Sequence, residues 1–114
     1  MEEVVYDTNQ LIAFLKSGKR NAKGFTTILN IIEFPKALDL KELAVICSTL
    51  DDYDESLKIS AALLRKGTPL PAVDILIAAI CIRRNLRLCT TDKHFTNIKS
   101  VRNTFKLQLT SSLK

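Results

Sequence analysis

The stretch GTPLPAVDILIAAICIRRN, residues 67–85, contains the longest apolar run of the chain. Between Val73 and Ile82 every residue is apolar except Asp74. A segment of this composition belongs in a protein core, where a carboxylate costs several kcal/mol unless something pairs with it. If Pro71 takes the first helical position, Asp74 lies beyond the N-cap, on the helix face that it shares with Cys81. The stretch therefore raises the question of what balances the charge of Asp74.

On both sides of this segment, strand-like and helix-like patterns alternate. We predict strands at 2–6, 25–29, 43–50, 86–91 and 105–109, and helices at 7–19, 30–38 and 51–67 and around Asp74. The strands are apolar and alternate little, which is typical of a parallel sheet covered by helices on both faces. The predicted fold class is therefore α/β, as a single domain over residues 1–114.

The sequence DDYDESLKISAALLRKG predicts an amphipathic helix between the third and fourth strands. Asp52 and Glu55 stand at capping-box spacing near its start, and we expect Leu57, Ala61 and Leu64 to face the core. Capping and the helix dipole account for its acidic residues, so we assign no chemistry to them.

Composition limits the possible compartments and partners. The three cysteines, Cys47, Cys81 and Cys89, stand among aliphatic residues without a C-x-x-C pair, which predicts buried, reduced thiols in a cytoplasmic protein. The start, MEEVVYD, is acidic where a signal peptide is basic, and no apolar run reaches the roughly 20 residues that cross a bilayer. We therefore expect no membrane role. The net charge of +5 favours an anionic partner such as RNA or DNA.

Four separated acids are predicted to meet at one edge of the sheet. Asp7 follows the first strand, Glu33 comes shortly after the second, and Asp92 follows the fourth. The helix of Asp74 begins at the same edge, which is where parallel α/β folds bind ligands. Three of these acids also fit structural roles: Asp7 as an N-cap, Glu33 in a capping box with Asn30, and Asp92 as the cap of a turn. A cap explains Asp74 poorly.

Such a cluster requires a counter-charge. Two carboxylates about 4 Å apart repel by roughly 4 kcal/mol at an effective dielectric near 20. A set of oxygen ligands without histidine or thiol indicates Mg²⁺ or Mn²⁺, and the chemistry typical of such a site is phosphodiester hydrolysis. The only histidine, His94, has no serine or cysteine placed to use it, and we expect a surface or packing role.

Together, these residues resemble a known family. VVYDTNQLIAFL, TTILNIIEF, LPAVDILIAAI and LRLCTTDKHF look like the four acidic blocks of the PIN domain, particularly of VapC-type toxins, in their usual order and over nearly the whole chain. The resemblance implies a three-layer α/β/α sandwich with a parallel sheet of four or five strands in the order 3-2-1-4-5. It also implies a Mg²⁺- or Mn²⁺-dependent endoribonuclease that cleaves RNA, forms a homodimer and has an antitoxin partner.

The resemblance also implies roles for individual residues. By position, the catalytic and metal-binding residues would be Asp7, Glu33, Asp74 and Asp92, the polar residues supporting them Asn9 and Thr91, and the phosphate contact Lys93. Two departures stand out. Only about ten residues separate Glu33 from the third predicted strand, where many VapC proteins have a further pair of helices. His94 occupies a position where relatives often carry a second acid.

Two other functions compete with this interpretation. A noncatalytic PIN-like domain that binds RNA or acts as a scaffold could keep the acids for folding alone, although intact carboxylates at all four positions argue against it. A phospho-accepting receiver domain also combines a small parallel α/β fold with aspartates at strand ends. It is disfavoured because Asp7 has no acidic neighbour and FKLQL is not followed by Lys-Pro.

Overall fold

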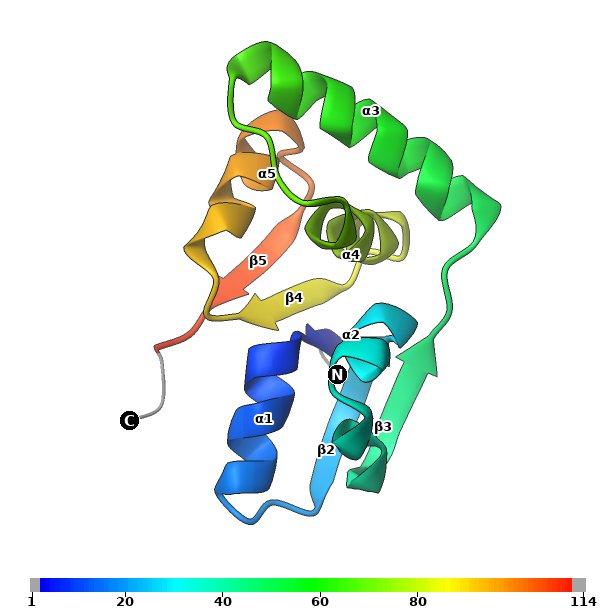
Figure 1. Cartoon of the computed structure of the whole chain (residues 1–114), viewed down its shortest axis with the longest axis vertical. Coiled ribbons are helices and arrows are strands. Elements are labelled where there is room, and N and C mark those ends of the chain that lie inside the picture. The colour runs from blue at the N-terminus through cyan, green and yellow to red at the C-terminus, as the bar shows by residue number, and fades with distance from the viewer. Residues whose placement is uncertain (1–2, 112–114) are drawn as a thin grey trace.

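The computed structural model describes residues 3–111 as a five-stranded parallel sheet flanked by helices (Figure 1). The strands are β1 (Val4–Tyr6), β2 (Asn21–Thr27), β3 (Lys41–Ile46), β4 (Arg87–Thr90) and β5 (Lys106–Leu109). The α-helices are α1 (Thr8–Lys16), α2 (Ile28–Glu33), α3 (Leu50–Lys66), α4 (Ala72–Arg83) and α5 (Thr96–Val101), and two 3-10 helices are η1 (Pro35–Asp39) and η2 (Lys93–Phe95). Glu2, which we predicted in the first strand, lies outside the described residues.

The strand order is β3-β2-β1-β4-β5, and all four pairings are parallel, so the predicted α/β fold and its 3-2-1-4-5 order are confirmed. Helices cover both faces of the sheet because alternate strand residues enter two separate hydrophobic clusters. Val5 belongs to the cluster beneath α3, α4 and α5, whereas its neighbour Tyr6 packs on the cluster that holds Leu11 of α1 and Ile31 of α2. Figure 1 shows α4 near β4 and α5 near β5, with α3 packed against α4 and α5, whereas α1 lies near β2 and α2 near β3.

Helix α4 is the buried helix expected from its composition. Six of its twelve residues are buried, and five of these belong to the hydrophobic cluster that also contains Ile59 and Leu63 of α3. Pro71 is the N-cap rather than the first helical residue, so Asp74 lies in the first turn of α4 and not one turn further in. No helix formed by residues 3–111 is both long and apolar enough to cross a membrane.

Helix α3 faces the core with a different stripe from the predicted one. Ile59 and Leu63 are fully buried, whereas Leu57, Ala61 and Leu64 are exposed, so the prediction that these three point inward was wrong. The helix has one apolar stripe with Leu57 and Leu64 and another with Ile59 and Leu63. Periodicity alone does not say which of the two packs on the core. The position of Asp52 decides it, because this buried carboxylate shares the inner face with Ile59 and Leu63.

Asp52 links the start of α3 to the end of α4. Its Oδ1 accepts hydrogen bonds from the guanidinium groups of Arg83 and Arg84, both at 2.8 Å, and Oδ2 accepts from Arg84 at 3.1 Å. The backbone N–H of Thr49, the N-cap of α3, also donates to Oδ2 at 2.8 Å. Asp52 therefore pairs with Thr49 in the capping box, and Glu55, predicted as its partner, instead binds Arg102 at 3.0 Å.

Two local predictions around β2 and β3 need correction. The strand predicted at 25–29 is β2 at 21–27, and α2 begins directly at Ile28 because the Thr27 side chain caps it. Cys47 was predicted to be buried but is exposed, since it follows β3, an edge strand most of whose residues face solvent. Cys81 and Cys89 are buried as predicted.

Gly24 lies on β2 beside Val4 and Tyr6 of the neighbouring strand β1. Its φ is +150°, and a Cβ atom at this position would lie 2.9 Å from the Tyr6 ring and 3.0 Å from the backbone oxygen of Val4. The pairing of β2 with β3 shifts register just before this residue. A glycine is required here by its backbone conformation and by the lack of space.

Candidate functional site

The four predicted acids lie at the carboxyl edge of the sheet. Asp7 directly follows β1, and Asp92 comes two residues after β4, the parallel neighbour of β1. Glu33 is the last residue of α2, which follows β2, and Asp74 is in the first turn of α4. The negative charges of Asp92, Asp7 and Glu33 all act on Asp74. The structure thus brings the four acids into one electrostatic neighbourhood.

Asp7 is buried and held by three hydrogen bonds. Its Oδ1 accepts from the backbone N–H of Thr8 and from the side-chain amide of Asn30, both at 2.9 Å, and Oδ2 accepts from the hydroxyl of Thr90 at 2.7 Å. Burial raises the pKa of Asp7, the three hydrogen bonds oppose this, and the charge of Glu33 raises it further. Asp7 is also the N-cap of α1, so its structural role and its place in the cluster coincide.

Asn30 fixes the positions of two acids at once. Its amide nitrogen donates to Asp7 and, at 3.0 Å, to the hydroxyl of Thr8, which in turn donates to Glu33 at 2.7 Å. Its amide oxygen accepts from the hydroxyl of Thr27 at 2.7 Å. The predicted capping box of Asn30 and Glu33 is therefore wrong, because α2 begins at Ile28 and the box is formed by Thr27 and Asn30.

Thr90 supplies the hydroxyl at the centre of the site. It donates to Asp7 and accepts from the backbone N–H of Asp92 at 3.1 Å, with a longer contact of 3.5 Å to the amide of Asn9. Thr91, which we predicted to support the acids, donates its backbone N–H to Asn9 at 3.4 Å. Our reasoning from the sequence missed Thr90 and the amide of Asn30, although both interrupt otherwise apolar stretches just before an acid.

The remaining predicted residues are more exposed. Asp92 caps the 3-10 helix η2, and its Oδ1 accepts from the backbone N–H of His94 at 2.9 Å and contacts His94 Nδ1 at 3.0 Å. Lys93, between them, is exposed. Glu33 is also exposed apart from its bond with Thr8. His94 lies on the surface, as expected.

Asp74 differs from the other three acids because nothing in residues 3–111 pairs with it. Its half-buried carboxylate forms no hydrogen bond and no ion pair with that part of the chain. Burial, followed by the charges of Asp92, Asp7 and Glu33, raises the pKa of Asp74 to about 6, against a smaller opposing effect of His94. The site therefore carries negative charge that the described residues do not neutralise.

The donor set suits a hard cation. All four acids offer oxygen ligands, and the unpaired Asp74 lies among like charges that a cation would compensate. Among residues 3–111, no three histidine, cysteine or acidic side chains already form a metal-binding group. Mg²⁺ does not need one, since it is commonly bound through one or two carboxylates and otherwise by water and phosphate oxygens. The residues present thus fit a hydrated magnesium-like ion.

Comparison with known proteins identifies the fold. The sequence matches no protein-family profile and no curated protein. Among solved structures, a chain of VapBC2 from Rickettsia felis, bound to a promoter DNA fragment, has a TM-score of 0.76 and 17% identity over 93% of this chain and 97% of that chain. DNA-bound VapBC from Salmonella typhimurium gives a TM-score of 0.76 and 20% identity, over 95% and 98% of the two chains.

A third structure has the same architecture. VapBC-5 from Mycobacterium tuberculosis, a member of the VapBC family of toxin-antitoxin systems, has a TM-score of 0.69 and 18% identity over 96% of this chain and 98% of that chain. Each of these likenesses covers nearly the full length of both chains. Together with the strand order, they show that the chain has the PIN-like fold of VapC-type toxins that its four acidic blocks predict.

Proposed function

We propose that this protein is a metal-dependent endoribonuclease that hydrolyses RNA phosphodiester bonds. The observation that carries the proposal is Asp74, a half-buried carboxylate without a partner in the described chain, whose pKa three other acids help to raise to about 6. An unpaired charge in this position lowers stability, which is typical of a functional site rather than of a folding contact.

The proposed cofactor is Mg²⁺ or Mn²⁺, held directly or through water by Asp7, Glu33, Asp74 and Asp92. Such an ion supplies a Lewis acid that polarises the scissile phosphate and lowers the pKa of a bound water. Asn30 and Thr90 keep the Asp7 carboxylate in place, and the Thr8 hydroxyl orients Glu33. Asn9 and Thr91 support the neighbouring loop, and exposed Lys93, beside Asp92, is a candidate contact for the phosphate.

The proposed partners are RNA, an antitoxin and a second copy of the chain, acting in the cytoplasm. The net charge of +5 attracts a polyanion toward acids that would otherwise repel it. The solved structures with this fold include VapBC assemblies described as toxin-antitoxin systems, which supports a role as the toxin of such a pair.

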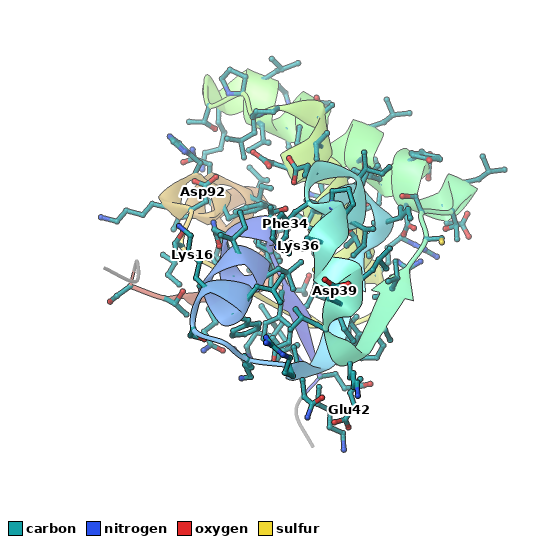
Figure 2. All side chains as sticks on the ribbon, turned by 60° about the horizontal axis from the view of Figure 1, so that its bottom comes forward. Lys16, Phe34, Lys36, Asp39, Glu42 and Asp92 are labelled. Carbon is teal, nitrogen blue, oxygen red and sulfur yellow. The ribbon has the colours of Figure 1, made fainter. Side chains whose placement is uncertain are left out.

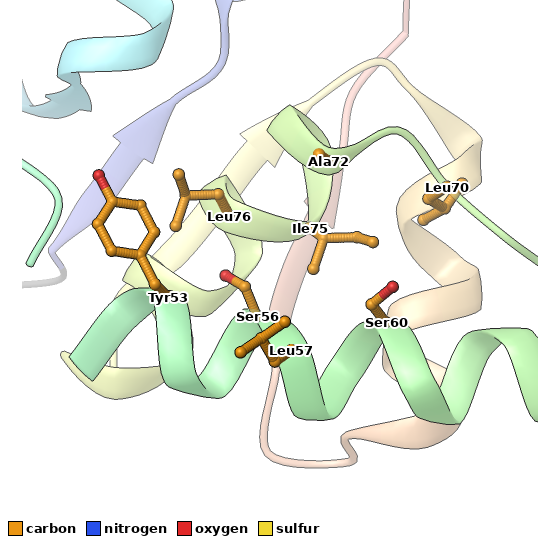
Figure 3. Close-up of a pocket in the computed structure, with 8 residues that line it drawn as sticks. All are labelled: Tyr53, Ser56, Leu57, Ser60, Leu70, Ala72, Ile75 and Leu76. Carbon is orange, nitrogen blue, oxygen red and sulfur yellow. The ribbon is translucent and has the colours of Figure 1, made fainter. Parts of the chain in front are cut away.

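We propose that the second copy binds on the outer face of α3. Its exposed apolar residues lie along one stripe of the helix at positions 50, 53, 57 and 64, with Leu50, Leu57 and Leu64 exposed by 83%, 71% and 62%. Leucines seven residues apart form the seam along which two helices pair. The stripe borders a groove of about 470 Å³ between α3 and α4, which Figure 3 shows with Tyr53, Leu57 and Leu76 along it. A contiguous apolar surface of this kind marks an interface between proteins.

A noncatalytic PIN-like domain that binds RNA or acts as a scaffold is the alternative. Two observations favour it: Asp7 and Asp92 also serve as helix caps, and among residues 3–111 no ready-made metal group is formed. In that case the acids would be kept for folding. Asp74, which caps nothing, distinguishes the two functions.

Cleavage of end-labelled structured RNA tests the proposal. Purified protein is incubated with Mg²⁺, Mn²⁺ or EDTA, alongside Asp7→Asn, Asp74→Asn and the surface control Asp54→Asn. We expect discrete metal-dependent fragments from the wild type and from Asp54→Asn, and none from the two site variants. Identical fragments from wild type and Asp74→Asn would indicate a contaminating ribonuclease and would leave the binding domain as the better function.

A further inference from the structure

A groove of about 830 Å³ runs between the end of α1 and the segment formed by Phe34 and η1. Its walls combine apolar side chains, including Ile12, Leu15 and Phe34, with the basic residues Lys16, Arg20 and Lys36. Figure 2 labels Lys16, Phe34 and Lys36 on this side of the molecule. None of the residues proposed above for catalysis lines the groove, so it is a separate feature of the surface.

The groove carries more positive than negative charge. Its three basic residues face a single acid, Asp39, and all four side chains are exposed. Within residues 3–111, Lys16, Arg20 and Lys36 form no ion pair, and the guanidinium of Arg20 has only a long contact of 3.5 Å with the backbone oxygen of Gly18. Their charge is therefore available to an anionic ligand.

Both walls of the groove follow residues of the acidic site along the chain. Helix α1 begins at Thr8, whose hydroxyl binds Glu33, and Ile12 and Lys16 follow on the same face at intervals of four residues. Lys16 thus lies about 12 Å along the helix from Thr8, at 1.5 Å per residue. On the opposite wall, Phe34 directly follows Glu33. An RNA strand that extended from the acids between these two walls would enter the groove.

We propose that this groove holds the single-stranded RNA on one side of the cleavage point, a proposal that rests on the nuclease function given above. Phosphates lie against Lys16, Arg20 and Lys36, and a base packs on Phe34, the combination typical of single-strand binding. Four carboxylates repel a polyanion, so cations next to them are needed to hold the flanking phosphates. An acidic protein segment could bind the same three cations, but its binding would not require that the groove lie next to the four acids.

Binding of a fluorescein-labelled single-stranded RNA of mixed sequence, measured in EDTA at several salt concentrations, tests the groove without cleavage. The variants are Lys16→Gln, Arg20→Gln and Lys36→Gln, with Lys66→Gln at the end of α3 as the charge-matched control. Because each lost phosphate contact lowers the salt slope by about 0.7, we expect each groove variant to bind about fivefold more weakly in 0.1 M salt. The control should bind like the wild type.

Each other outcome has a definite meaning. Groove variants that bind RNA like Lys66→Gln, or a wild type that binds no RNA in EDTA, would overturn the proposal. If the same variants instead lose binding of labelled polyglutamate while keeping RNA, the groove is a docking site for an acidic protein. RNA binding through these residues without any metal-dependent cleavage would reject the nuclease but keep the groove. If the groove variants cleave RNA at the wild-type rate, the nuclease function is kept and the role of the groove in holding RNA is rejected.

Discussion

The side-chain amide of Asn30 donates to the carboxylate of Asp7 across 2.9 Å, and neither group is appreciably exposed to water. Replacing this donor with an acceptor places two carboxylates in contact. We expect Asn30→Asp to lower the free energy of unfolding at pH 7 by about 3 kcal/mol, because the two buried charges then repel each other. Urea unfolding measures the loss of stability. The control is Asn103→Asp, the same substitution at an exposed position. Equal stability of both variants would mean that Asn30 does not hold Asp7.

Two adjacent threonines provide a matched pair for testing the site. Thr90→Val removes the hydroxyl that binds Asp7 and Asp92, whereas Thr91→Val removes one without a hydrogen bond to either acid. Groups that orient metal ligands typically contribute 10- to 100-fold to metal affinity or activity, so we expect about that loss of Mn²⁺ affinity and RNA cleavage for Thr90→Val alone. Calorimetric titration of Mn²⁺ and initial cleavage rates measure it. Equal effects at both positions would contradict the role assigned to Thr90.

Asp74 should reduce the stability of the metal-free protein. Its pKa of about 6 exceeds the ordinary value of 3.8, so the folded state loses stability as the pH rises from about 4 to 6. Above that range the folded protein carries the full cost of an ionised Asp74 that is half-buried among like charges. In EDTA at pH 7.5 we expect Asp74→Asn to be more stable than the wild type by about 1 kcal/mol, a figure reduced for the partial exposure of the side chain. Below pH 4 the difference should vanish.

Adding Mn²⁺ should reverse that order. A ligand that binds only the folded state raises its stability, so the melting temperature of the wild type should rise with Mn²⁺ while that of Asp74→Asn stays nearly constant. Thermal melts in EDTA and in Mn²⁺ measure both effects with the same samples. A variant that is less stable than the wild type in EDTA would show that Asp74 supports the fold by itself.

Asp52 gives the opposite pH dependence. Although burial raises it, the hydrogen bonds from Arg84 and Arg83 hold the pKa of Asp52 well below its usual range. Its contribution to stability is therefore complete above the unfolded-state pKa near 3.8 and is lost as the pH falls toward the folded-state value. We expect Asp52→Asn to be less stable than the wild type by about 2–3 kcal/mol at pH 7, with the gap narrowing below pH 4. Urea unfolding from pH 2 to 7 measures this gap, and a constant gap would contradict it.

The outer stripe of α3 makes a prediction about assembly. Leu57→Glu combined with Leu64→Glu places two charges on the exposed leucine seam and leaves the buried face of Ile59 and Leu63 unchanged. We expect the wild type to sediment as a dimer and the double variant as a folded monomer, which melts at a lower temperature because it lacks the stabilisation that dimer formation adds to the folded state. Leu38→Glu, an exposed leucine of η1, is the control. A monomeric wild type at 0.1 mM would reject the dimer.

The sequence was most informative where a long-range rule applied. Apolar strands alternating with helices predict a parallel sheet, and the resemblance to PIN domains adds the order 3-2-1-4-5, which the structure confirms. It was least informative where one residue had to be chosen among equivalent neighbours. Thr90 and Thr91 have the same chemistry, and only the pleat of β4 determines which hydroxyl turns toward Asp7. Likewise, the inner stripe of α3 is determined by Arg83 and Arg84, which are distant in sequence from Asp52.

The close contact between Gly24 on β2 and the neighbouring strand β1 limits which sequences can adopt this sheet. A side chain of any size would collide with the Tyr6 ring and with the backbone of Val4, and the φ of +150° is strained for every residue other than glycine. Shrinking Tyr6 would relieve only the first collision. In a library of all single substitutions sorted by cellular abundance, position 24 should be almost empty, and no second-site change at Tyr6 should refill it.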